Sequence, residues 1–125
     1  MSRVLIVDDE ANVRTAVMQL LLSFNRSDLN VDQVSNGAEA LRRLQSRHYD
    51  LMLADTDMPG MSGADLMRSV RGNDKLDSLP VIMMLAVGAG RQTVHDAVAL
   101  GISGFVIKPF RPDQLLVQLR KVLGW

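Results

Sequence analysis

The sequence contains no cysteine, which excludes disulfide bonds and thiolate metal sites. It also carries no net charge, because 14 basic residues balance 14 acidic ones, so no global field attracts nucleic acid or an anionic membrane. No apolar run approaches membrane-spanning length. The opening residues, MSRVLIVDDE, are too acidic and too short in their apolar part for a signal peptide. We therefore expect a cytoplasmic protein that binds neither nucleic acid nor membrane directly.

The composition is that of an ordinary folded domain. Of the 125 residues, 47% are hydrophobic and 22% are charged, which excludes a disordered chain. The length suits one domain with a sizeable core, and we find no repeat, linker or low-complexity stretch. We expect a single domain over 1–125, either complete or excised from a longer protein.

Short apolar runs alternate with segments of helical period along the whole chain. The pattern predicts strands at 4–7, 29–34, 51–54, 81–85 and 104–107, and helices at 11–24, 37–45, 63–71, 93–100 and 112–123. In the second helix we expect Ala38, Leu41 and Leu44 to face inward. Five strand–helix pairs in strict alternation predict an α/β fold, a parallel sheet with helices on both faces.

Charged side chains follow several of the predicted strands. The stretch LMLADTDMPG at 51–60 leads from a buried run into Asp55, while Asp8 and Asp9 follow the first strand and Lys108 follows the fifth. In parallel α/β sheets the ligand site lies at the carboxyl ends of the strands, where the strand order reverses. We therefore expect three carboxylates and one amine to meet at one edge of the sheet.

Such a set of groups is suited to phosphoryl chemistry. Clustered acids repel one another unless a cation compensates, and Mg²⁺ prefers carboxylate oxygens while it keeps waters that a phosphate can replace. A lysine such as Lys108 supplies a mobile positive charge for a phosphate oxygen. A carboxylate beside both cations is a plausible nucleophile, and Asp55 is the candidate.

Four stretches together resemble the receiver domain of bacterial two-component response regulators. They are VLIVDDE, YDLMLADTDMPGMSG, LPVIMM and GFVIKPF, and the resemblance covers essentially the whole chain. It implies a flavodoxin-like, doubly wound, five-stranded parallel sheet in the order 2-1-3-4-5 with five helices.

The resemblance also implies the role of each site residue. Asp55 would take phosphate from a histidine kinase or a phosphotransfer protein. Asp8, Asp9, Asp55 and the main-chain carbonyl of Asp57 would hold Mg²⁺, and Lys108 would bind the phosphoryl group. The domain would be a regulatory phosphoacceptor and not an enzyme, although it would catalyse its own phosphorylation and slow dephosphorylation. Its output domain or target protein is open.

The switch residues follow the family only in part. Phe105 stands at the position of the switch aromatic, and the resemblance implies a cis peptide bond before Pro109. The family ends the fourth strand with serine or threonine, whose hydroxyl binds the phosphate. This chain has Leu85 there, and a register shifted by one residue gives Ala86, which has no hydroxyl either.

Some alternatives stay open at this point. Asp57 is either a turn residue or one that tunes the lifetime of the phosphate. Leu85 favours a pseudo-receiver, an adaptor read without phosphate, whereas the intact acids and Lys108 oppose it. The pair Asp55 and Asp57 also matches the D-x-D of haloacid-dehalogenase-type phosphatases, but Pro59 stands where that family has threonine or valine.

Overall fold

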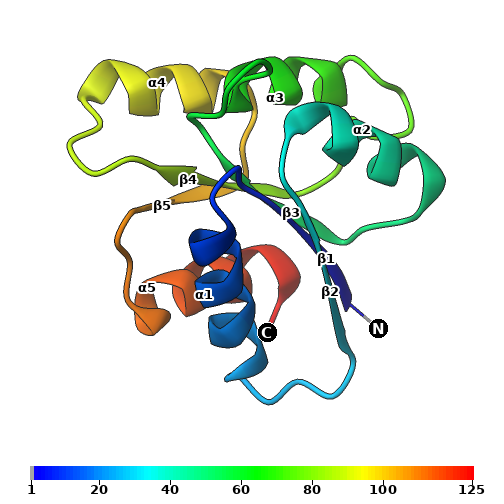
Figure 1. Ribbon diagram of the computed structural model, residues 1–125, viewed down its shortest axis with the longest axis vertical. Coiled ribbons are helices and arrows are strands. Elements are labelled where there is room, and N and C mark those ends of the chain that lie inside the picture. The colour runs from blue at the N-terminus through cyan, green and yellow to red at the C-terminus, as the bar shows by residue number, and fades with distance from the viewer. Residues whose placement is uncertain (1) are drawn as a thin grey trace.

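One parallel sheet forms the centre of the computed structural model, which describes residues 2–125 (Figure 1). Its strands are β1 (Ser2–Val7), β2 (Leu29–Val34), β3 (Leu51–Asp55), β4 (Val81–Leu85) and β5 (Gly104–Ile107). The helices are α1 (Ala11–Leu22), α2 (Gly37–Ser46), α3 (Gly63–Arg71), α4 (Arg91–Ala99) and α5 (Pro112–Leu123). The strand order is β2-β1-β3-β4-β5, so the predicted fold class and order are confirmed.

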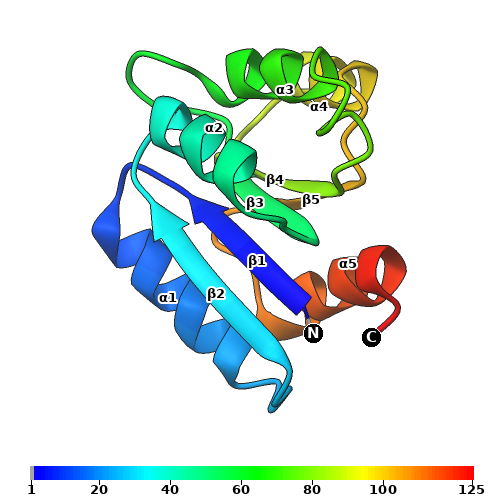
Figure 2. The ribbon, with the colours of Figure 1, turned by 90° about the vertical axis from the view of Figure 1, so that its right-hand side faces the viewer.

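Helices cover both faces of the sheet and enclose two cores. Helices α1 and α5 lie on one face, and α2, α3 and α4 lie on the other (Figures 1 and 2). Every residue of β3 and β4 is buried, as expected for parallel strands covered on both sides. Figure 2 shows β2 at the open edge, and only one of its residues, Val34, is buried.

Several predicted helix details are wrong. Helix α1 ends at Leu22 and not at Phe24, although the Phe24 ring still packs edge-on against Trp125, with centroids 6.1 Å apart. In α2, Ala38 is exposed while Ala40 is fully buried. The predicted Leu41 and Leu44 do face the core, and with Gly37 and Ala40 they form the i, i+3, i+4, i+7 stripe of one helical face. Asn36 caps the helix by accepting a hydrogen bond from the Glu39 N–H.

The other differences are at element ends. Strand β1 begins at Ser2 and β3 extends to Asp55, one residue beyond the predicted end. Helix α2 ends at Ser46, and α4 spans Arg91–Ala99 instead of 93–100. No helix among residues 2–125 is long and apolar enough to cross a membrane.

The strand register aligns the ends that carry the charged residues. Val7 pairs with Ala54, Asp55 with Met84 and Leu85 with Ile107. The residues that follow β1, β3 and β5 therefore emerge at the same edge of the sheet.

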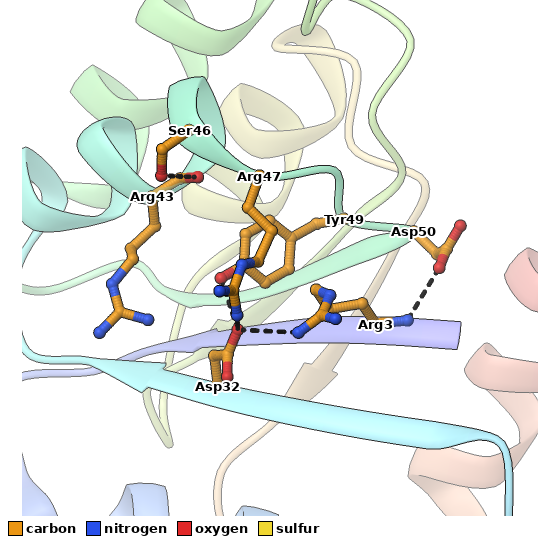
Figure 3. Close-up of polar contacts among 7 residues, drawn as sticks. All are labelled: Arg3, Asp32, Arg43, Ser46, Arg47, Tyr49 and Asp50. Atoms are coloured by element: carbon orange, nitrogen blue, oxygen red, sulfur yellow. Dashed lines mark hydrogen bonds and ion pairs between the residues drawn. The ribbon is translucent and has the colours of Figure 1, made fainter. Parts of the chain in front are cut away.

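A polar network lies on the α2 side of the sheet, away from that edge (Figure 3). The buried Tyr49 hydroxyl donates a hydrogen bond of 2.6 Å to Asp32 Oδ2. The same oxygen lies 3.6 Å from Arg3 Nη1 and 3.5 Å from Arg47 Nη1. Burial raises the pKa of Asp32, but the Tyr49 hydrogen bond and the charges of Arg3, Arg47 and Arg43 outweigh it and lower this pKa below the ordinary 3.8.

This network predicts a pH-dependent effect of Tyr49→Phe. Because the folded-state pKa of Asp32 is lowered, its stabilisation is present above 3.8 and is lost as the pH falls through the folded-state pKa. We expect Tyr49→Phe to lower the free energy of unfolding at pH 7 by about 1.5–3 kcal/mol, because it removes a hydrogen bond to a charged group. The loss should shrink in urea unfolding measured in acid. Arg47→Met, which removes an exposed ion pair, is the control and should cost at most about 1 kcal/mol. A Tyr49→Phe loss that stays constant into strong acid would contradict this account.

Candidate functional site

The turn after β1 places Asp8 in the interior with all its acceptor atoms engaged. Asp8 is fully buried, and its N–H continues the sheet by donating to Val34 O at 3.3 Å. Oδ1 accepts from the Glu10 N–H at 2.9 Å, and Oδ2 lies 3.0 Å from Lys108 Nζ. The backbone oxygen accepts from Arg14 Nη1 at 2.7 Å. The orientation of the Asp8 carboxylate is thus fixed by its neighbours.

Asp55 ends β3 and is held by a tight approach of α3. The Thr56 N–H donates to Met84 O at 3.2 Å, and the Gly63 N–H donates to Thr56 O at 3.0 Å. A Cβ atom on Gly63 would lie 2.5 Å from Asp55 O and 2.8 Å from Thr56 Cα. Only glycine therefore allows the first turn of α3 to pack this closely behind the Asp55 backbone.

Lys108 joins the two buried carboxylates. Its Nζ lies 3.0 Å from Asp8 Oδ2 and 3.1 Å from Asp55 Oδ1, and the lysine side chain is only 20% exposed. Its backbone N–H donates to Leu85 O at 2.8 Å, which ties the lysine to the end of β4. The Lys108–Pro109 peptide bond is cis, the geometry that the resemblance implies.

Burial and the neighbouring charges shift the pKa values of both Asp55 and Lys108. Burial raises the pKa of Asp55 above 3.8, the Asp8 charge raises it further, and the hydrogen bond and charge of Lys108 only partly oppose this. Burial lowers the pKa of Lys108, but hydrogen bonds to Asp8 and Asp55 outweigh it, so the pKa rises above 10.5. The lysine stays charged at neutral pH, whereas ionisation of Asp55 carries a cost.

A group of acidic oxygens suitable for a hard cation lies beside this triad. Carboxylate oxygens of Asp8, Asp9 and Glu10 can be chosen within 4.8 Å of one another. Asp9 and Glu10 are exposed, so an ion can approach from solvent. Asp55 is linked to the group through Lys108, and Asp57 is exposed two residues later. This oxygen donor set fits Mg²⁺, which prefers such ligands and retains several waters.

The end of β4 brings no hydroxyl to the site. Leu85 is fully buried in the core under α2, α3 and α4, and partly buried Phe105 packs against the same core. The Thr56 hydroxyl is already used, because it donates to Met84 O at 3.4 Å. Leucine therefore ends β4, where the resemblance implies serine or threonine, and it pairs with Ile107 of β5.

A groove of about 580 Å³ leads from the surface to Asp55 and Lys108. Its walls come from α1, from the loop after β4 and from the segment after β5. They include Val13, Val17, Leu20, Ala86, Val87, Pro109 and Phe110, together with the polar residues Glu10, Asn12 and Asp57. The carboxylate of Asp55 is thus reached along a mainly apolar channel.

Sequence reasoning identified the acids and the lysine but missed Glu10 and Arg14. Glu10 follows the two aspartates directly, so its position in the DDE stretch was the available signal. Arg14 is four residues after Glu10, one helical turn away, a spacing that lets its side chain reach back over the turn.

The sequence matches a protein-family model. The model for the response regulator receiver domain matches residues 4–120. The chain belongs to this family. The receiver is 36% identical to chemotaxis protein CheY of Pseudomonas aeruginosa over 120 residues, covering 96% of this chain and 94% of that protein. It is also 36% identical to CheY-3 of Vibrio cholerae, covering 96% and 90%.

Solved structures share the receiver fold. The chemotaxis protein CheY4 of Vibrio cholerae has a TM-score of 0.86 at 30% identity, with 98% of each chain covered. The receiver domain of a Pseudomonas aeruginosa sensor histidine kinase has a TM-score of 0.86 at 23% identity, covering 99% and 98%, and was solved with a magnesium ion in its active-site cleft.

The raised pKa of Asp55 predicts a more stable Asp55→Asn variant without metal. A raised folded-state pKa means that stability is fully present below 3.8 and is lost as the pH rises through the folded-state value. Asparagine cannot ionise and should escape this loss. In chelator at pH 7 we expect Asp55→Asn to unfold at higher urea concentration than the parent, and the two should converge in acid. Exposed Asp57→Asn is the control. A less stable Asp55→Asn at pH 7 would show that the carboxylate is stabilising.

Proposed function

We propose that this receiver is a phosphoacceptor signalling domain that takes a phosphoryl group onto Asp55 in the presence of Mg²⁺. The observation that carries the proposal is the contact of one lysine with both buried carboxylates, 3.0 Å from Asp8 and 3.1 Å from Asp55. The donor is a histidine kinase or a phosphotransfer protein, and the phosphorylated domain acts on a target protein or an attached output domain.

The acids at the β1–α1 turn hold the cation in this proposal. The family resemblance implies Asp8, Asp9, Asp55 and the Asp57 carbonyl as ligands. The position of Glu10, whose carboxylate lies with those of Asp8 and Asp9, adds a further oxygen to this set. Bound Mg²⁺ neutralises charge on the phosphoryl oxygens during transfer. The magnesium found in the related histidine-kinase receiver supports this assignment.

Asp55 is the nucleophile. An ionised Asp55 oxygen attacks phosphorus, the bond from phosphorus to the donor breaks, and the donor leaves with that electron pair. Lys108 contacts both acids with one ammonium group on a long, flexible stem, so in this proposal it exchanges one carboxylate for a phosphoryl oxygen. The groove beside Asp55 gives a donor access from the α1 side.

A pseudo-receiver is the second candidate, and Leu85 is the observation that favours it. With leucine buried at the end of β4, no hydroxyl from this strand reaches a phosphoryl group. Phosphate chemistry at Asp55 and signal output are therefore separable. A haloacid-dehalogenase-type phosphatase is disfavoured, because the receiver match covers residues 4–120.

Acetyl phosphate should add one phosphate to the protein. We expect intact mass spectrometry to show a single addition that requires Mg²⁺ and is absent in Asp55→Asn. In Lys108→Ala the addition should be slowed by about a hundredfold or more, because loss of one preorganised charge costs catalysis about 2.7–4 kcal/mol. Asp57→Asn should still be phosphorylated, although with an altered lifetime if Asp57 tunes hydrolysis. Full phosphorylation of Asp55→Asn would refute the assignment.

Leu85→Thr should restore long-range switching. A hydrogen bond to a charged group contributes about 1.5–3 kcal/mol, or a factor of about ten to a hundred in the switching equilibrium. With a beryllofluoride mimic, NMR shifts in the parent should stay near Asp55 and reach Phe105 and α4 only weakly. In Leu85→Thr they should spread to both, whereas Leu85→Val should behave like the parent. Far-reaching shifts in the parent, unchanged by Leu85→Thr, would mean that the signal travels by another route.

A further inference from the structure

The guanidinium group of Arg14 binds the backbone of the acidic turn, the segment of Asp8, Asp9 and Glu10 after β1. Arg14 lies in the second turn of α1, and its Nη1 donates a 2.7 Å hydrogen bond to the backbone oxygen of Asp8. Its Nε donates to Gln33 Oε1 on β2 at 3.3 Å, and its own N–H donates to Glu10 O at 3.1 Å. One residue thus connects the acidic turn, the first helix and the edge strand.

The Arg14 hydrogen bond satisfies the backbone carbonyl of Asp8, which lies beyond the end of the β1–β2 ladder. The β1–β2 ladder ends where Val7 pairs with Val34, and the Asp8 N–H makes its last bond, to Val34 O. The Asp8 carbonyl lies beyond this ladder in a fully buried residue, where an unmade hydrogen bond would be costly. Arg14 supplies the donor.

The bond also fixes the peptide that joins the two aspartates. The Asp8 carbonyl belongs to the Asp8–Asp9 peptide unit, and the plane of this unit sets the direction of the backbone as it enters Asp9. The Glu10 N–H is bound to Asp8 Oδ1 at 2.9 Å, so the turn is held on both sides. Without Arg14, repulsion among the Asp8, Asp9 and Glu10 carboxylates would favour more open arrangements of the turn.

We propose that Arg14 is a positioning residue that preorganises the acidic turn of Asp8, Asp9 and Glu10 for Mg²⁺. This inference rests on the proposed function, since it concerns the cation site of the same receiver. In this proposal Arg14 influences Mg²⁺ binding through its hydrogen bond to the Asp8 backbone. The alternative is a residue that influences Mg²⁺ binding only through its positive charge.

The two modes of action predict opposite changes in Mg²⁺ affinity when Arg14 is replaced. A cation close to a metal site repels Mg²⁺, so loss of its charge alone would tighten metal binding. Loss of a positioning contact weakens binding, because the free turn must then be ordered when the ion enters. Arg14→Met, which keeps an apolar stem but removes charge and donors, separates these cases.

The test is an NMR titration of the full chain with Mg²⁺, which follows the amide signals of residues 8–10 and 55–57 in folded molecules only. We expect the dissociation constant to rise about tenfold in Arg14→Met, which corresponds to about 1.4 kcal/mol, and to recover partly in Arg14→Lys. Gln33→Leu is the matched control, because it removes the other side-chain partner of Arg14 but leaves the bond to Asp8. It should bind Mg²⁺ nearly as the parent does.

Two further measurements separate the explanations. Urea unfolding in chelator shows whether Arg14→Met is merely less stable, and a purely structural role would lower stability while the affinity of folded molecules stays unchanged. Phosphorylation by acetyl phosphate at saturating Mg²⁺ should return close to the parent rate. Unchanged or tighter Mg²⁺ binding in Arg14→Met would overturn this proposal alone, whereas a parent that binds no Mg²⁺ and takes no phosphate would overturn the proposed function.

Discussion

Two buried carboxylates held by one ammonium group are the constraint on which the site depends. Asp8 and Asp55 are almost completely shielded from water, and a buried charge without a partner costs several kcal/mol. Lys108 lies close to both acids and remains partly accessible, with 20% of its side chain exposed. The site therefore has two acids for one lysine, and binding of a cation or a phosphoryl group changes this balance of charge.

The surrounding structure serves to bring these three groups together. Parallel register aligns the ends of β1, β3 and β5, and the bond from the Lys108 N–H to Leu85 O fixes where the lysine leaves the sheet. Gly63 lets α3 pack against the Asp55 backbone. In our proposal Arg14 extends the same principle to the acidic turn, because its guanidinium binds the backbone oxygen of Asp8 instead of a carboxylate. Leu85 adds the opposite feature, an apolar end of β4 where the family has a hydroxyl.

The sequence was sufficient for the fold and for the residues that directly follow the strands. Strand–helix alternation predicted the parallel sheet, and strand ends predicted the meeting of Asp8, Asp55 and Lys108, because topology alone brings them to one edge. In α2 the prediction placed Leu41 and Leu44 correctly but chose Ala38 over Ala40, although Ala40 is the alanine that shares their face at helical spacing. The role of Arg14 could not be predicted, since a side chain that binds a backbone carbonyl leaves no pattern of paired residue types.

The most direct test of this account is the ionisation of Asp55 itself. Carbon-detected NMR can follow the Asp55 carboxyl as the pH changes in chelator, in the parent and in Lys108→Met. The account predicts a pKa above 3.8 in the parent, because burial and Asp8 outweigh the lysine, and a still higher value when the ammonium group is removed. An Asp55 pKa that Lys108→Met leaves unchanged would contradict the claim that this lysine holds the site together.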